Sequence, residues 1–387
     1  MKAGMHEVVI TPPLGSFMPG YFGNRKSTGV KDELYAKALV IESDAKVMCL
    51  ISIDALYIPS KEANAVRERL SQELGIQADQ IMISATHSHT GPPVRKGADG
   101  SPNETYLSIL VDKMCDVATQ AYHSRKPAKL GIGVGEEKEI SFNRRYYMKD
   151  GSVRTNPGFA NQAEIDRPAG PIDPEVTVIR VDDLDGNAIG VVVNFACHTD
   201  TVGGSEYSGD FPGEMSRMLK QVLGPEVVSL FLLGACGNIN HVDFMNGDAA
   251  RKQKHETMGR IMAGEVLKVR EKITCLTEVP LQFSNTFYPF ELRRPSAMEI
   301  EEAKQILGRE DRANEHFFAE QVLLIDQLTE HNAEAEIQAI RIGDWAVVGL
   351  PGEIFVEFGL ELKQHSPFSR TLVNTLCNGS IYGYVCT

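Results

Sequence analysis

Short apolar runs alternate with longer amphipathic segments in the first third of the chain. The runs Ala36–Glu42 and Val47–Asp54 are separated by Ser-Asp-Ala-Lys, which predicts a hairpin of buried strands. An expected helix over Ser60–Leu74, a further strand and an amphipathic, helical segment over Asn103–Tyr122 follow. This strand, helix, strand order is typical of a sheet that is at least partly parallel.

The second half of the chain repeats this alternation. Two strands joined through Asp185–Gly186 predict another hairpin, and the second of them runs into His198. The remaining expected elements are, in order, a helix from near Asp210 to about Val222, a strand over Val227–Leu233, helices over Asp248–Lys272 and Ala297–Glu330, and strands at Glu336, Trp345 and Thr371. The pattern therefore predicts an α/β fold, with a mixed parallel and antiparallel β-sheet core flanked by helices.

Two polar stretches interrupt this pattern. The first lies between Ile140 and Pro171 and reads as a long loop, which in a compact domain is commonly functional. This stretch contains a cluster of arginines and tyrosines that would suit a polar or anionic substrate, namely Arg144, Arg145, Tyr146 and Tyr147. A solvated loop with an incidental charge cluster is an equal alternative. The second is a small-residue turn, of a kind that lets backbone N–H groups approach a ligand, and it presents Asn238, Asn240, His241 and Asp243.

Composition limits the classes of function. The 387 residues contain no repeat, low-complexity tract or linker, so we expect one compact catalytic unit over residues 1–387. The formal net charge of −13 argues against a general affinity for nucleic acid or anionic lipid. The N-terminus lacks the apolar region of a secretory signal, and no window is long and apolar enough to span a membrane. We therefore expect a soluble cytoplasmic protein that acts on a small molecule, and the sequence leaves its oligomeric state open.

Histidines follow two of the predicted strands. His87 and His89 lie two residues apart in T-H-S-H, so in an extended strand their side chains would point to the same face. Gly91 and Pro92 then end the strand, and His198 ends another. Ligands of α/β proteins tend to bind beyond the carboxyl ends of strands. The pair is thus a candidate for metal binding or proton transfer, with a surface pair of no function as the alternative.

Other strand ends carry oxygen ligands. Imidazoles at two ends, the Glu353 carboxylate at a third and phenols at a fourth would form a tetrahedral set for zinc, with one position left for water. Zinc lowers the pKa of bound water toward neutrality and so makes hydroxide available to attack a carbonyl. Asp54, which closes an early strand, could support a metal-bound histidine or could cap the turn before the Ser60–Leu74 helix.

The order of several short motifs resembles the neutral (alkaline, non-lysosomal) ceramidases, in their N-terminal catalytic domain. The motifs are I-T-P-P with a downstream G-Y-F-G, A-T-H-S-H-T-G-P, N-R, F-A-C-H, S-G-D, G-A-C-G-N, P-G-E and the final N-G-S-I-Y-G-Y. They run through nearly the whole chain. The resemblance implies the ceramidase catalytic-domain fold, a Zn²⁺ ion held by two His, a Glu and a Tyr, and hydrolysis of the amide of an N-acylsphingosine.

The resemblance also implies roles for individual residues. The metal ligands it implies are His87, His198, Glu353 and Tyr384. His89 would orient the attacking water or stabilise the tetrahedral oxyanion. Arg144, next to Asn143, matches the substrate-side arginine of the family, and Asp210 of S-G-D would anchor the wall of the active site.

The chain departs from the family pattern at three places. Asn240 stands where the family has a functional Ser, and His241 stands where it has Pro. The immunoglobulin-like domain that follows the catalytic domain in ceramidases has no counterpart here, and the chain ends three residues after Tyr384. These differences make ceramide itself an unexpected substrate, while the metal chemistry can survive them.

Three hypotheses follow. The leading one is a zinc-dependent hydrolase that cleaves an amide or a similar bond in a small polar molecule, with Asn240 and His241 in the active site. A second keeps the zinc but assigns a hydrolase or lyase reaction on a carbohydrate-derived compound. The third is a relative without catalysis that only binds a metal or ligand, for which a closed site without an open water position would be typical.

Overall fold

The first predicted hairpin is confirmed as the strands β3 (Tyr35–Ser43) and β4 (Lys46–Ile53). They pair antiparallel through a turn in which Asp44 and Ala45 both have positive φ, as a two-residue type I′ hairpin requires. β4 then runs parallel to β5 (Ile81–Ala85), so the prediction of a partly parallel sheet is also confirmed. The structure is a computed structural model that describes residues 1–387 except 24, 96–102, 247–253, 310–312, 330 and 382.

Two large sheets form the core. The first has eight strands, in the order β14 (Val228–Leu233), β12 (Ala188–Phe195), β11 (Glu175–Asp183), β6 (Lys126–Glu136), β1 (Lys2–Val9), β3, β4 and β5. The second has four strands, in the order β16 (Leu281–Glu291), β17 (Asn332–Ile342), β18 (Trp345–Gly349) and β20 (Arg370–Asn374). The predicted hairpin at Asp185–Gly186 is confirmed, because β11 and β12 pair antiparallel on either side of it. Both sheets contain parallel and antiparallel neighbours, as the sequence predicts.

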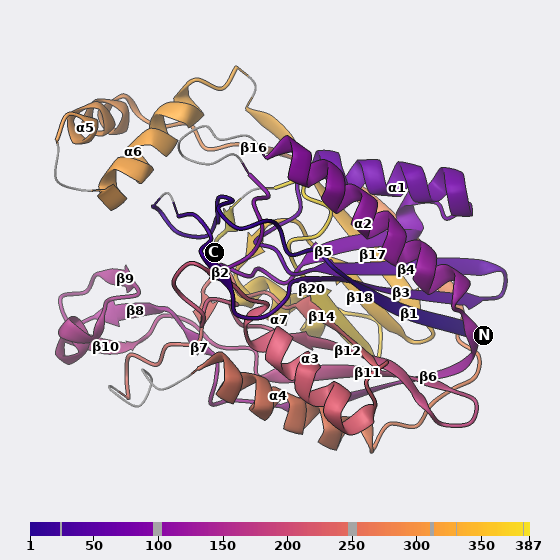
Figure 1. Cartoon of the computed structure of the whole chain (residues 1–387). Helices are drawn as coiled ribbons and strands as arrows, with labels where there is room; N and C mark the ends of the chain where they lie inside the picture. The colour runs from indigo at the N-terminus through magenta and orange to yellow at the C-terminus, as the bar shows by residue number, and fades with distance from the viewer. Residues whose placement is uncertain (24, 96–102, 247–253, 310–312, 330, 382) are drawn as a thin grey trace.

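Helices cover the sheets on two opposite sides (Figure 1). α1 (Ser60–Leu74) and α2 (Glu104–His123) pack on β3, β4 and β5, whereas α3 (Asp210–Leu223) and α4 (His255–Arg270) pack on β11, β12 and β14. Strand β4 shows why both faces are apolar: Cys49 and Ile51 face α1 and α2, while Met48 and Leu50 join a core with the second sheet. Strands covered on both faces read as continuous apolar runs rather than as alternating ones.

The remaining elements are small. Three strands make a separate sheet in the order β10 (Ile165–Pro168), β8 (Arg145–Met148) and β9 (Val153–Thr155). Three pairs of two-residue strands are β2 (Gly29–Val30) with β13 (Glu206–Tyr207), β7 (Phe142–Asn143) with β15 (Ile239–Asn240), and β19 (Glu353–Ile354) with β21 (Tyr384–Val385). The other helices are α5 (Ala297–Leu307), α6 (Ala313–Asp326), α7 (Val356–His365) and the 3₁₀ helices η1 (Ala78–Gln80) and η2 (Phe159–Glu164).

The prediction of a long loop between Ile140 and Pro171 is wrong. This stretch contains β7, β8, β9, η2 and β10, and the three-stranded sheet has an apolar core of its own. Tyr146 is 1% exposed in that core, with Met148 and Phe244. It is therefore not available to a substrate.

Two helix predictions also need correction. The single helix expected over Ala297–Glu330 is two helices, α5 and α6, because α5 ends at Leu307 and is followed by Gly308, a residue that disfavours the helix interior. Residues 310–312 and 330 of that prediction lie outside the described residues. Of the helix expected over Asp248–Lys272, the structure describes α4 from His255, and 248–253 lie outside the described part. Within the described chain, no helix combines the length and apolarity that a membrane crossing needs.

A buried amide joins the two large sheets. Asn194, near the end of β12, donates from Nδ2 to the carbonyl oxygen of Leu232 on β14 and to that of Val373 on β20, each at 2.9 Å. Its side chain is 2% exposed, so water cannot replace these bonds. This contact fixes the second sheet against the strands that lead to the candidate site.

We expect Asn194→Ala to lower the free energy of unfolding by about 2–4 kcal/mol, because two buried carbonyl oxygens each lose a donor. Asn187→Ala, in the exposed turn between β11 and β12, is the control and should cost less than about 1 kcal/mol. Urea unfolding of both variants and of the wild type provides the measurement. Equal losses in the two variants would contradict this role of Asn194.

Candidate metal centre

Two histidines at strand ends present the same nitrogen to one space. His87 follows β5 with a φ of 68°, and its Nδ1 donates to the carbonyl oxygen of Leu56 at 2.8 Å. His198 follows β12, and its Nδ1 donates to the carbonyl oxygen of Cys236 at 2.8 Å. Because both Nδ1 atoms are engaged by carbonyls, both Nε2 atoms are left as acceptors. The ring centroids lie 4.6 Å apart.

A carboxylate and a phenol reach the same space through a short parallel strand pair. Glu353 begins β19 and lies opposite Tyr384 in β21, so the backbone register sets the two side chains next to each other. Glu353 Oε2 is 3.3 Å from Nε2 of His87 and 3.3 Å from Nε2 of His198. The structure thus brings four residues from four distant segments together, and these are the four that the family resemblance implies as ligands.

The electrostatics suit ligands of a cation. Burial would raise the pKa of Glu353, but His87 and His198 hold it well below its ordinary value, so the carboxylate is charged. Burial, together with the positive charge of Arg144, lowers the pKa of His198 to about 3, so this imidazole is neutral. For His87 burial lowers the pKa, yet the Glu353 carboxylate and the Leu56 carbonyl raise it above its usual value. Partial burial and Glu353 raise the pKa of the Tyr384 phenol.

Two unpaired, buried atoms fit a cation-binding site. Glu353 Oε2 and His198 Nε2 are both buried without a hydrogen-bond partner among the described residues. Such groups carry a desolvation cost unless a cation or donor satisfies them. Within the same part of the chain, the ligand atoms of His87, His89 and His198 lie within 4.8 Å of one another and could hold a metal ion. Neutral imidazoles and a carboxylate are ligands that zinc accepts, although other metals accept them too.

His89 lies beside this group. Its Nε2 is 3.4 Å from Nε2 of His87, and its Nδ1 is 3.7 Å from Oδ1 of Asp200. Tyr21 donates its hydroxyl to the same Asp200 oxygen. Burial and the neighbouring His87 hold the pKa of His89 well below its ordinary value. Gly20 permits this packing, since it has a φ of 116° and a Cβ there would lie 3.0 Å from Cα of His89.

Arg144 is the member of the predicted Arg/Tyr cluster that reaches the site. Its Nη2 donates to the carbonyl oxygen of Gly237 at 2.6 Å and to the hydroxyl of Tyr384 at 3.0 Å. Asn143, the residue before Arg144, lies in β7, and its pairing with Ile239 of β15 positions Arg144. Arg145 instead lies over the ring of Phe355, at 5.3 Å from its centroid. Tyr147 stacks with Arg167 on the surface.

The polar turn after β14 has mainly structural contacts. Asn240 donates from Nδ2 to Oδ1 of Asn156 at 2.9 Å and accepts from the backbone of Val242. His241 has a buried Nδ1 without a partner in the described chain, and burial lowers its pKa, against the effect of Asp200 and Asp210. The structure thus sets His241 near Asp200, while the Asn240 amide is engaged in holding the turn.

The two other polar residues of the turn also bind the chain itself. Asn238 accepts from the backbone N–H of Val356 at 2.8 Å and donates to Glu357, so it holds the start of α7. Asp243 accepts from the backbone of Met245 at 2.8 Å within its own turn. Gly237 is required for close approach, because a Cβ there would lie 2.5 Å from the carbonyl oxygen of Glu353.

Asp210 shapes the backbone that follows His198. Its carboxylate accepts from the N–H groups of Thr201 and Val202, each at 2.9 Å, and from the Thr201 hydroxyl. It is 1% exposed and sits at a φ of 57°, at the start of α3. These contacts hold the loop that follows His198, and the role of Asp210 at the wall of the active site stays a prediction.

Two residues that lie beside His89 are not predicted from the sequence. Tyr21 and Asp200 were not singled out, although Tyr21 belongs to the G-Y-F-G motif and Asp200 follows His198 by two residues. Asp54 has neither proposed role: it accepts from the Tyr35 backbone and from Thr86, and α1 begins after Pro59 without a side-chain cap. The carbonyl of Leu56 orients His87 instead.

Comparison with solved structures supports the fold. The chain matches the neutral ceramidase from Pseudomonas aeruginosa with a TM-score of 0.74 at 20% identity, covering 100% of this chain and 68% of that one. A structure described as ceramidase complexed with C2 matches with a TM-score of 0.74 at 18% identity, covering 100% of this chain and 69% of that chain. The α/β fold therefore matches the neutral ceramidase catalytic domain, as the sequence resemblance implies.

Sequence comparison gives the family. Neutral ceramidase A of Dictyostelium discoideum is 26% identical over 220 residues, which are 54% of this chain and 29% of that protein. Neutral ceramidase of Mycobacterium tuberculosis is 24% identical over 216 residues, 52% of this chain and 32% of that protein. The chain thus spans about a third of the length of these relatives. The profile of the neutral/alkaline non-lysosomal ceramidase N-terminal domain matches residues 3–223, more than half of the chain, and the protein belongs to this family.

Proposed function

We propose that this protein is a zinc-dependent amidohydrolase, which holds the metal with His87, His198, Glu353 and Tyr384 and cleaves the amide bond of a small polar N-acyl compound. The observation that carries the proposal is the position of Glu353 Oε2, 3.3 Å from the Nε2 atoms of His87 and His198. A carboxylate between two imidazoles suits a divalent cation. Relatives named as neutral ceramidases support amide hydrolysis as the reaction.

The residues around the ligands have separate roles in this proposal. A bound zinc ion supplies Lewis acidity and lowers the pKa of a coordinated water. His89, beside His87, orients the nucleophile or accepts its proton at Nε2. Asp200, which accepts from Tyr21, places a carboxylate 3.7 Å from Nδ1 of His89. Arg144 stabilises negative charge that develops on the carbonyl oxygen of the substrate.

The substrate is a smaller and more polar amide than ceramide. Arg144 has no carboxylate partner within the described chain, so its charge is available at the site. His241 and Asp200 add polar groups to the wall near His89. The same polar wall favours, as a second candidate, a carbohydrate-derived substrate for this metal centre. A panel of N-acyl amino acids, N-acyl amino sugars, short-chain ceramide and acyl-free sugar derivatives separates the two.

We expect the purified wild type to hold about one equivalent of zinc, and His198→Ala and Glu353→Ala to hold less than about a tenth of that. His89→Ala should keep its zinc, because His89 is assigned to the neighbouring position and not to the ligand set. Metal analysis of dialysed protein is the measurement, with thermal unfolding to confirm that each variant folds. His123→Ala, at the exposed end of α2, is the control.

The pattern among these variants decides the ligand set. Full zinc retention in His198→Ala and Glu353→Ala would rule out this centre. Loss of zinc in His89→Ala, with retention in a Tyr384→Phe variant, would replace Tyr384 by His89 as the ligand.

We expect Arg144→Ala to lower kcat by about 10²-fold on the best amide of the panel, since removal of one donor to a developing oxyanion has an effect of this size. Zinc content should stay close to that of the wild type, because three of the four proposed ligands, His87, His198 and Glu353, form no bond with Arg144. Arg145→Ala is the matched control, as the adjacent side chain lies over Phe355. Similar kcat values in the two variants would contradict a role of Arg144 in the reaction.

A further inference from the structure

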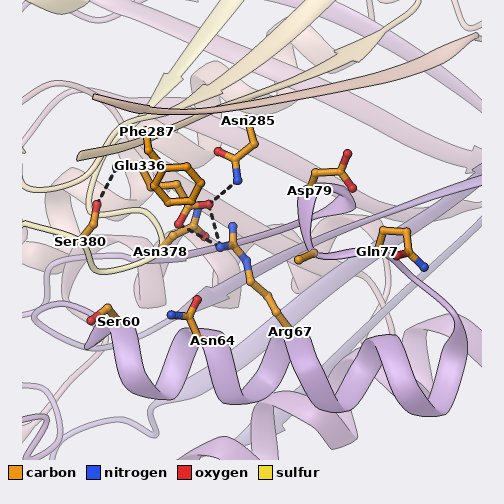
Figure 2. Close-up of a pocket in the computed structure, with 11 residues that line it drawn as sticks. Ser60, Asn64, Arg67, Gln77, Asp79, Asn285, Phe287, Glu336, Asn378 and Ser380 are labelled. Carbon is orange, nitrogen blue, oxygen red and sulfur yellow. Dashed lines mark hydrogen bonds and ion pairs between the residues drawn. The ribbon is translucent and has the colours of Figure 1, made fainter. Parts of the chain in front are cut away.

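A second cavity lies away from the metal centre, between α1 with η1 on one side and β16 with β17 on the other (Figure 2). Its volume is about 520 Å³, and none of the candidate metal ligands lines it. Pockets of about 300–1,000 Å³ commonly hold small molecules. The cavity is therefore large enough for a ligand of the size of one or two sugar rings.

The floor of the cavity is a fixed network around a buried ion pair. Arg67 of α1 donates to both carboxylate oxygens of Glu336, at 2.7 and 3.0 Å, and to Gln338 at 3.1 Å. Its Nε and Nη2 also donate to the carbonyl oxygen of Ile81. All three nitrogen atoms of Arg67 are thus engaged, and the guanidinium offers little to an anionic ligand. Asn378 donates to Gln338 at 2.9 Å and completes the floor.

The walls carry polar groups that this network leaves free. Asn285 is not one of them, because its Nδ2 donates to Glu336 at 2.8 Å and its Oδ1 is buried. Asn64 projects from α1 toward the cavity (Figure 2). Its amide forms no hydrogen bond among the described residues. The Asp79 side chain adds a carboxylate that has no ion-pair partner within the same residues. These groups offer both donors and acceptors to hydroxyl groups of a ligand.

An aromatic ring lies beside these polar groups. Phe287 of β16 lines the cavity, and it is 55% exposed, so a ligand can reach its ring. A flat aromatic face next to amide and carboxylate groups matches a ligand with a C–H face and hydroxyl edges. The Arg67–Glu336 pair explains how α1 holds β17. The Phe287 ring and the Asn64 and Asp79 side chains take no part in this pair.

We propose that this cavity binds a neutral saccharide, with Phe287 against the apolar face of a sugar ring and with Asn64 and Asp79 bonded to its hydroxyl groups. Charge selects against anionic ligands, because Glu336 neutralises Arg67 and Asp79 leaves an unpaired negative charge. The proposal is independent of the reaction at the metal centre, since the two sites share no residue.

Saturation-transfer NMR on the full chain tests this assignment. The probes are glucose, galactose, mannose, N-acetylglucosamine and cellobiose, with glucose 6-phosphate as the charged comparator. We expect at least one neutral sugar to bind with a millimolar or lower Kd, and Phe287→Ala to weaken it about tenfold, which is 1.4 kcal/mol. Tyr288→Ala is the matched control, because Tyr288 is the adjacent exposed residue of the same strand and does not line the cavity.

Each result bears on the proposal. Binding that is lost in Phe287→Ala, weakened in Asn64→Ala and retained in Tyr288→Ala supports it. No transfer to any neutral sugar at tens of millimolar, stronger binding of glucose 6-phosphate, or equal binding by Phe287→Ala and Tyr288→Ala would overturn it. Phe287 and Tyr288 are both exposed, so both variants are expected to fold, and thermal unfolding verifies this.

Discussion

The structure depends on one electrostatic constraint, a buried carboxylate between two imidazoles. Glu353 Oε2 lies 3.3 Å from Nε2 of both His87 and His198, and neither contact has the geometry of a hydrogen bond for that oxygen. Burial would make the charged carboxylate unfavourable, yet its neighbours hold its pKa well below the ordinary value. A cation in this position would satisfy the carboxylate and both nitrogen atoms together. A role in stability alone would more simply be filled by apolar side chains.

Backbone carbonyls orient the groups around this constraint. Leu56 holds His87 and Cys236 holds His198 through Nδ1, and Gly237 holds Arg144 through Nη2. Glu353 and Tyr384 are aligned by the register of β19 and β21. These contacts come from loops and short strands at the ends of the two large sheets, which are themselves joined by Asn194. Backbone atoms therefore hold most of the site residues in place, and a substitution of a neighbouring side chain does not easily disturb them.

The sequence predicts the buried hairpins and the segments that meet at the site. It does not predict the elements whose structure depends on tertiary contacts. The sequence does not predict β6, because the glycines at 131, 133 and 135 weaken the strand pattern. These positions need glycine because Val269, near the end of α4, and Ile273, just beyond it, fill the space that a Cβ atom on the glycines would take. β16 was missed because most of its residues are exposed and it contains a proline. Tyr146 looked polar and available, whereas its ring completes a small core. Asp200 and Tyr21 meet only in the folded chain.

The most direct test of the central claim is an anomalous difference map from crystals grown with zinc, collected at the zinc absorption edge. The account predicts one strong peak about 2.0–2.2 Å from Nε2 of His87, Nε2 of His198 and Oε2 of Glu353. A fully zinc-loaded crystal with no peak between these three side chains, or with its zinc bound elsewhere, would contradict it.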